Sequence, residues 1–199
     1  MFLLNTLIGS LTVGLTAAAP LQAVPAAIPS RPTTEDELFK PSVAARAWKT
    51  IVLHHSATRG GNVASIDAVH RQQKDRAGNP WLGIGYHFVV GNGQKMGDGE
   101  IRPTFRWLKQ LPGAHAGQRD YNEQGIGICL IGNFDDTPPT DKQLLALQGL
   151  LKTLAQQYEI PRQRVLRHAA IQATLCPGRL FPWEQTVASV PLDFPPKHP

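Results

Sequence analysis

The sequence predicts a single α/β domain in which helices flank a mixed central β-sheet. Three observations indicate this class: apolar, β-branched runs typical of buried strands recur along the chain, a clear helical leucine period lies between two of them, and 42% of the 199 residues are hydrophobic. A chain of this length can bury a full core without disulfide bonds. We expect the domain to span residues 45–190.

The N-terminal part differs in composition from the domain. The first 30 residues contain no charged side chain, and an apolar block leads into small residues and prolines, so residues 1–23 resemble a secretory signal. This predicts export to the periplasm, the cell wall or the medium, without stable membrane insertion after processing; a disordered Ala/Pro-rich extension is the alternative. Residues 24–44 predict a linker or an N-terminal wrap, and residues 191–199 a Pro-rich tail.

The first half of the domain predicts a strand, a helix and a second strand. "TIVLHH" (50–55) is β-branched and apolar, as in a buried strand. Ser65 is a possible cap for a helix through "IDAVHRQQKDRAG", which Gly78 and the following Asn-Pro would stop. "GYHFVVG" (85–91) predicts a second strand, and the Asn92-Gly93 pair after it predicts a hairpin turn.

The second half predicts a central strand, a long helix and a short last strand. "GIGICLIGNF" (125–134) is apolar almost throughout, as in a strand covered on both faces. In the next segment Thr140 and Gln143 form a capping box, and a core-facing stripe follows at helical spacing, made of Leu144, Leu147, Leu151, Leu154 and Tyr158. "RVLRH" (164–168) predicts the last strand, and residues 179–187 predict a final helical turn.

The charge pattern limits the choice of partner. The net charge of +5 favours an anionic partner such as an acidic wall polymer. The basic residues form no run and do not alternate with aromatic residues, so we expect no nucleic-acid binding. We expect the protein to be a monomer.

Three metal-binding residue types stand at predicted strand ends or just beyond them. His54 ends the first strand, His168 ends the last, and Cys176 lies in the following turn. Two histidines and a cysteine can bind zinc, but no short-range zinc motif is present and a histidine in a strand is often structural. A disulfide between Cys176 and Cys129 also remains open, although the apolar surroundings of Cys129 favour a structural role.

Four sequence blocks, taken together, resemble one family. "IVLHHSAT", "GIGYHFVVGNG", "GAHAGQRDYNEQGIGICLIGNF" and "HAAIQATLCPG" occur in this order. They resemble the signature blocks of the zinc-dependent N-acetylmuramoyl-L-alanine amidases of type 2, which share their fold with the peptidoglycan recognition proteins. The resemblance extends from Trp48 to Trp183 and implies that fold for the predicted α/β domain.

The resemblance implies a zinc centre held by His54, His168 and Cys176. Three protein ligands leave one tetrahedral position for a water, whose pKa zinc lowers to about 7. Cys176 is then deprotonated and metal-bound rather than paired in a disulfide. The family match also implies catalytic roles for Tyr86 and for Thr174, a position where some members have lysine. Both hydroxyls are hydrogen-bond donors for an oxyanion.

The resemblance further implies a substrate groove lined by His115 and Asn122, and we place His87 with them. No glutamate matches an obvious proton shuttle of the family, which leaves Tyr86, a second water, His55 or His87 as proton carriers. His70, on the predicted helix, is expected to be structural.

The implied activity is hydrolysis of the amide between the lactyl group of N-acetylmuramic acid and L-alanine in peptidoglycan. A non-catalytic module that binds peptidoglycan or muropeptides is the alternative, although such members typically lose the zinc cysteine, which is present here as Cys176. Recycling of muropeptides and lysis of a competitor's wall are further settings for the same chemistry.

Overall fold

A five-stranded mixed sheet forms the centre of the computed structural model, which describes residues 40–75 and 77–194. The signal-like segment 1–23, most of the segment 24–44 and the end of the tail lie outside the described residues. The strand order is β3-β2-β4-β1-β5, and only β3 runs antiparallel to its neighbour. The predicted mixed sheet is therefore confirmed; its strands are β1 (Thr50–His55), β2 (Phe88–Val90), β3 (Ile101–Pro103), β4 (Gly125–Leu130) and β5 (Val165–Arg167).

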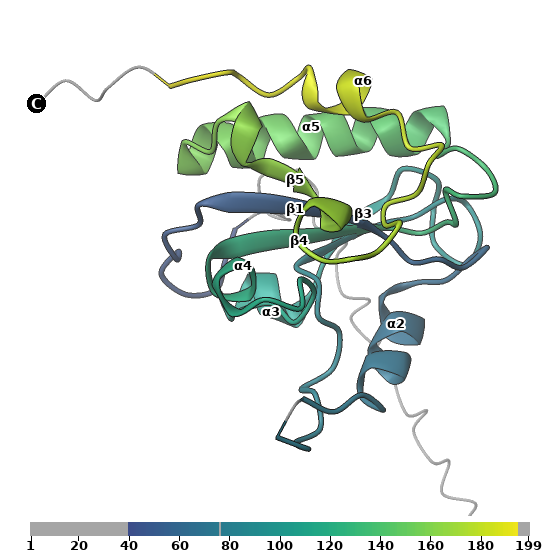
Figure 1. Cartoon of the computed structure of the whole chain (residues 1–199), viewed down its shortest axis with the longest axis vertical. Helices are drawn as coiled ribbons and strands as arrows, with labels where there is room; N and C mark the ends of the chain where they lie inside the picture. The colour runs from purple at the N-terminus through teal and green to yellow at the C-terminus, as the bar shows by residue number, and fades with distance from the viewer. Residues whose placement is uncertain (1–39, 76, 195–199) are drawn as a thin grey trace, which may run out of the picture. The chain divides into compact units, whose positions relative to one another are not determined.

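Helices lie on both sides of this sheet. Figure 1 shows α5 along one side, with α2 and α4 toward the other. None of the helices in the described part of the chain is both long and apolar enough to span a membrane. The helical elements are α2 (Val63–His70), α3 (Phe105–Leu108), α4 (Arg119–Gln124), α5 (Asp141–Tyr158), α6 (Trp183–Val187) and the 3-10 turns η1 (Arg162–Arg164) and η2 (His168–Ala170).

Alternation along the strands gives the sheet two different faces. Ile51 and Leu53 of β1 belong to the large core that includes the leucines of α5. Val52 lies in a separate small cluster, and with His54 it points to the opposite face, because successive strand residues alternate. All six residues of β1 and of β4 are buried, so both faces are covered. The expectation of a central strand covered on both faces is confirmed for β4.

Helix α5 agrees with its sequence pattern. Thr140 caps it, and the reciprocal bonds of the capping box between Thr140 and Gln143 are both present. Gln143 is itself buried and donates to the main-chain oxygens of Val90 and Ile131, which joins the helix start to the ends of two strands. The four predicted leucines are buried, and Tyr158 packs partly buried against the same core.

Helix α2 differs from its prediction at both ends. Its cap is Asn62, whereas Ser65 is the third helical residue and completes the capping box. The helix ends at His70 instead of continuing to Gly78. The main-chain N–H groups of Gln72 and Gln73 bond three residues back, and the Trp81 N–H bonds to the Gln73 oxygen, so the chain folds back at once. The Asp75 carboxylate holds this turn by accepting the N–H groups of Ala77 and Asn79.

The second predicted strand and its turn also differ. Only Phe88–Val90 pair as β2, and this strand pairs with β3, so residues 91–100 form a long connection instead of a two-residue hairpin. Gly93 does turn the chain, with φ of 85° and an N–H bonded to the carbonyl of Met96, but the turn lies inside that connection. The central strand ends at Leu130 and the last strand at Arg167, each shorter than its apolar pattern.

Candidate metal centre and substrate pocket

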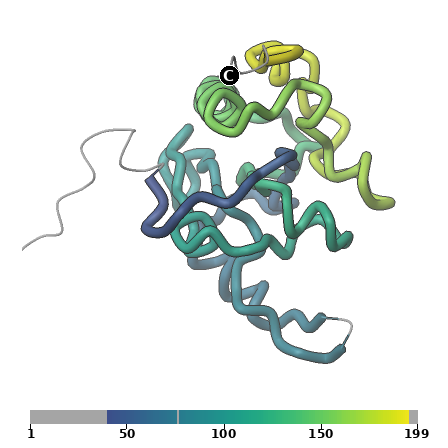
Figure 2. The backbone as a smooth tube through the Cα atoms, turned by 90° about the vertical axis from the view of Figure 1, so that its left-hand side faces the viewer, coloured from purple at the N-terminus to yellow at the C-terminus, as the bar shows by residue number. Residues whose placement is uncertain are grey.

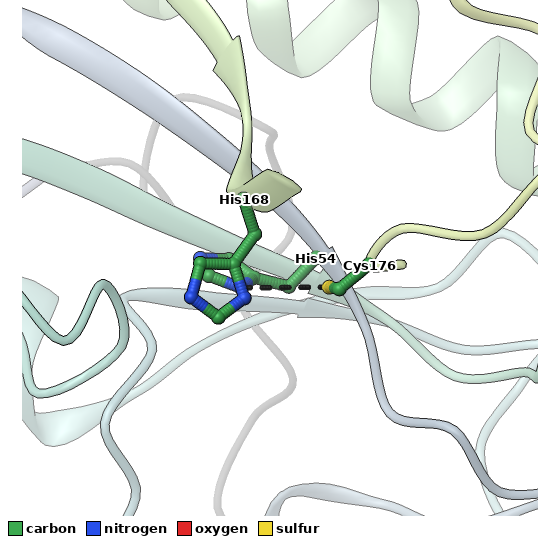
Figure 3. Close-up of side chains that lie close together, drawn as sticks. All are labelled: His54, His168 and Cys176. Atoms are coloured by element: carbon green, nitrogen blue, oxygen red, sulfur yellow. Dashed lines mark hydrogen bonds between the residues drawn. The ribbon is translucent and has the colours of Figure 1, made fainter. Parts of the chain in front are cut away.

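Three side chains from distant parts of the sequence converge at one edge of the sheet. Strands β1 and β5 are parallel neighbours, so their carboxyl ends meet there, and His54 lies near the end of β1 while His168 directly follows β5. Cys176 reaches the same place from the next loop (Figure 3). One ligand atom of each residue lies within 4.8 Å of the others. The Cys176 Sγ is 3.8 Å from His54 Nδ1.

This donor set fits a zinc ion. With Zn–N near 2.0 Å and Zn–S near 2.3 Å, tetrahedral geometry separates nitrogen and sulfur by roughly 3.5 Å, close to the observed spacing. Burial lowers the pKa of His54 and of His168, so both rings are neutral and able to offer a lone pair. Among the described residues, the buried His168 Nε2 has no hydrogen-bond partner, so this ring has an unused bonding site.

Both cysteines are free, buried thiols in the structure, so the disulfide that the sequence left open does not form. Burial raises the pKa of the Cys176 thiol to about 11, against a lowering from the hydrogen bond that the His55 main-chain N–H donates to the sulfur. The thiol alone is thus neutral at pH 7, and a bound cation is needed to hold it as thiolate.

Tyr86 and Thr174 each contact one of the three residues. The Tyr86 ring centroid is 5.0 Å from that of His54. Burial, together with the neighbouring thiols of Cys129 and Cys176, raises the pKa of Tyr86 well above its ordinary value, so Tyr86 remains protonated at neutral pH. The Thr174 hydroxyl accepts the Cys176 main-chain N–H at 3.3 Å, which leaves its own hydrogen free to donate.

Two pockets meet at Tyr86 and His70, which line both. The larger, of about 670 Å³, is also lined by His168, His115 and Asn122, and the smaller, of about 180 Å³, by residues of α2 and the loop after β1. The loop on either side of residue 76 projects away from the sheet (Figure 2) and supplies an outer wall to the larger pocket. Its apolar contributions are Pro80, Trp81 and the exposed Leu82.

The remaining predicted residues fall into two groups. His115 and Asn122 line the larger pocket, but they also bond inside the protein: the Asn122 Oδ1 accepts the N–H groups of His115 and Ala116. His87 is completely buried, and both of its ring nitrogens bond to main-chain groups of Leu111 and Gly127. His87 therefore has no free ring nitrogen for proton transfer or for a hydrogen bond to a substrate.

Two further histidines, His55 and His70, bond to main-chain groups near the site. His55 uses its Nδ1 to accept the Phe134 N–H, which orients the loop after β4. His70, expected to be structural, accepts the Gly85 N–H through Nδ1 yet is half-buried beside both pockets. The bond to Gly85 agrees with the expected structural role, and the His70 ring also lies beside Tyr86, with ring centroids 5.4 Å apart.

Comparisons with known proteins show the family to which the chain belongs. Residues 44–179 match the family described as N-acetylmuramoyl-L-alanine amidase. The endolysin of Enterobacteria phage T3 is 32% identical over 146 residues, which cover 70% of this chain and 85% of the endolysin. A peptidoglycan-recognition protein of Drosophila simulans is 33% identical over 134 residues, which cover 66% of this chain and 69% of that protein.

Comparisons with solved structures support the same family and fold. The N-acetylmuramoyl-L-alanine amidase LysC of Clostridium intestinale superposes with a TM-score of 0.60 at 29% identity, covering 75% of this chain and 91% of LysC. Human PGRP-IβC, solved in complex with glycosamyl muramyl pentapeptide, superposes with a TM-score of 0.53 at 24% identity, covering 72% of this chain and 84% of that one, which supports the fold.

Proposed function

Because the chain belongs to the N-acetylmuramoyl-L-alanine amidase family, the type-2 amidases and peptidoglycan recognition proteins, we propose that it hydrolyses the amide between the lactyl group of N-acetylmuramic acid and L-alanine in peptidoglycan. The single observation that carries the hydrolytic assignment is the convergence of His54, His168 and Cys176 within 4.8 Å. A module that only binds muropeptides needs no such donor set.

The chemistry divides between the implied metal and the protein. Zinc held by His54, His168 and Cys176 would supply a Lewis acid that polarises the scissile carbonyl and acidifies a water. The chain itself supplies the neutral imidazoles and a buried sulfur, to which the His55 N–H donates at 3.4 Å. This N–H disperses part of the negative charge of a thiolate.

The two hydroxyls are the oxyanion donors in this proposal. Tyr86 stays protonated because burial raises its pKa, and Thr174 keeps a free hydrogen because its oxygen accepts the Cys176 N–H. Donors fixed in advance beside a developing negative charge lower the barrier without reorganising during the reaction. Tyr86 also lines both pockets, so a substrate that occupies the two contacts its side chain.

The larger pocket is the proposed site for the muropeptide. Its volume of about 670 Å³ suits part of a glycopeptide chain. One wall carries the polar side chains of His115, Asn122 and Gln172, and the opposite loop carries apolar Trp81 and Leu82. A sugar-peptide ligand presents both kinds of surface, with amide and hydroxyl groups beside methyl groups. We include in the proposal that the protein acts outside the cytoplasm, where this substrate lies.

Digestion of purified peptidoglycan tests the proposal. The zinc-loaded protein is expected to release peptides with a new free L-alanine amino terminus, identified by mass spectrometry, and a chelator should stop the reaction until zinc is restored. Tight muropeptide binding by zinc-loaded protein without any new amino terminus would refute hydrolysis and favour the recognition role. Release of reducing sugar ends in place of peptide amino termini would show a different bond specificity.

A further inference from the structure

His115 lies against His54 on the edge of the ring that does not face Cys176. The His54 Nε2 is 3.1 Å from the His115 Nδ1, while the His54 Nδ1 is the nitrogen 3.8 Å from the Cys176 sulfur. The other nitrogen of His115, Nε2, lies 3.3 Å from the main-chain oxygen of Gly125. The three groups form a chain of two hydrogen bonds that ends at the metal-facing ring.

The Gly125 carbonyl sets the direction of both hydrogen bonds, the one between His115 and Gly125 and the one between His54 and His115. A carbonyl oxygen only accepts, so the His115 Nε2 must carry a hydrogen and donate it to Gly125. The His115 ring is buried, and a neutral imidazole has only one N–H, which here is the one on Nε2. Its Nδ1 is then an acceptor, and the His54 Nε2 must donate. The neutral His54 therefore has its lone pair on Nδ1, the atom beside Cys176.

The backbone holds the His115 ring in this place. A Cβ atom added to Gly127 would lie 2.5 Å from the His115 Cδ2, and one added to Gly113 would lie still closer to the same atom. Both glycines therefore leave the room that the ring occupies beside β4. The Asn122 Oδ1 fixes the adjoining main chain by accepting the N–H of His115 and that of Ala116.

From this arrangement we infer that His115 is a positioning residue of the metal centre: it fixes the tautomer and the orientation of His54 through a relay that starts at the Gly125 carbonyl. The inference rests on the metal site of the proposed function, but not on its substrate or reaction. It adds to the groove-lining role expected for His115 a second role that acts through His54. Groups that orient a ligating histidine in this way raise its basicity and the affinity for the metal.

An isosteric pair of substitutions tests the relay. His115→Asn places an acceptor oxygen near the position of Nδ1, whereas His115→Leu has the same branched shape without an acceptor. We expect His115→Leu to weaken zinc binding about 10- to 100-fold and His115→Asn to lose less than about tenfold, measured by competition with a chromophoric chelator. Gln143→Leu is the control, because it also removes the hydrogen bonds of a buried polar side chain but at the start of α5, and its zinc affinity should match that of the unaltered protein.

The tautomers give a second readout that requires no substitution. Long-range proton–nitrogen NMR correlations on the metal-free protein should show the hydrogen on Nε2 of both His54 and His115. A hydrogen on Nδ1 of either ring would overturn the inference, as would equal zinc affinities of His115→Asn and His115→Leu, or an unaltered protein that does not bind zinc. If the affinities and tautomers agree but peptidoglycan is not cleaved, the inference stands and the proposed hydrolytic function fails.

Discussion

The two faces of the central sheet are built on different principles, although the same strands supply both. Helix α5 covers one face with seven buried residues along its 18, six of them apolar, and five of these six pack into the large hydrophobic core. Helix α2 lies toward the other face and, within the described part of the chain, has no fully buried residue; its Val69 is 56% exposed. The second face instead carries buried histidines and a cysteine joined by hydrogen bonds.

This difference separates stability from chemistry. Burying apolar area is non-directional, so the α5 face tolerates small shifts and contributes most of the folding free energy. Directional bonds tolerate little displacement, and on the second face they hold His54, His115 and Cys176 where a metal needs them. Substitutions on the two faces should therefore fail in different ways: one should lower stability with the site intact, and the other should lose the site while the fold remains.

The largest effect is expected from Cys176→Ser. A neutral hydroxyl is a much poorer zinc ligand than a thiolate, so bound zinc and peptidoglycan cleavage should both fall below detection. The unfolding free energy of the metal-free variant should change by less than about 1 kcal/mol, since the side chains are similar in size. Metal analysis measures the bound zinc, and chemical denaturation of the same preparation measures the unfolding free energy. Full zinc occupancy with unchanged turnover would contradict the ligand assignment.

Leu151→Ala is the counterpart on the α5 face. The side chain is fully buried in the main core, so its truncation leaves a cavity and should cost about 2–5 kcal/mol of unfolding free energy. Zinc affinity and turnover should stay within about twofold at temperatures where the variant is folded, because distant sites contribute independently. Urea denaturation and chelator competition measure the two quantities. A parallel loss of zinc affinity would show that the faces are coupled.

Tyr86→Phe gives a smaller effect that is confined to the second face. The change removes one donor and keeps the ring contact with His54. Turnover should fall about 10²-fold, as for other single oxyanion donors, while zinc content stays complete. Steady-state kinetics on a soluble muropeptide and metal analysis of the same sample check this. If zinc is lost together with activity, Tyr86 supports the ligands instead of donating to substrate.

Sequence patterns predicted the α5 face better than the other one. The Thr140 capping box and the leucine period depend on residues three or four apart, so the sequence contains the whole signal. The end of α2 at His70 could not be found in this way, because the chain folds back there through a bond from the Trp81 N–H to the Gln73 oxygen, which helical spacing does not encode. Strand β3 has only three residues and includes a proline, so its own pattern is too weak to predict pairing.

In the candidate metal centre, too, the sequence predicted the motifs but not the contacts between residues far apart in the chain. Family motifs pointed to His54, His168 and Cys176, and the parallel strands bring these residues together. The link from His115 to His54 joins residues 61 apart and depends on ring orientation, which spacing does not encode. The two glycines that make room for the ring, Gly113 and Gly127, are visible in the sequence, but their purpose appears only when the loop lies beside β4.

The smallest expected effect concerns how α2 is held beside the site. Its Asp67 carboxylate accepts the Ile84 N–H at 2.8 Å and the Arg71 Nε–H at 2.6 Å. Burial opposes the charge, but these bonds together lower the pKa of Asp67 below its ordinary value of 3.8. A lowered carboxyl pKa stabilises the fold above the unfolded-state pKa, and the stabilisation is lost as the pH falls through the folded-state value.

Asp67→Asn should therefore lower the unfolding free energy by about 1 kcal/mol at pH 7, and the difference should shrink below about pH 4. Denaturation curves of both proteins between about pH 3 and 7 measure the trend. Glu123→Gln is the control, since its ion pair with Arg46 is more exposed and lies apart from α2. A destabilisation that persists unchanged at low pH would mean that Asp67 holds α2 through the shape of its side chain and not through its charge. The claim that polar bonds hold the second face of the sheet would then be wrong for α2.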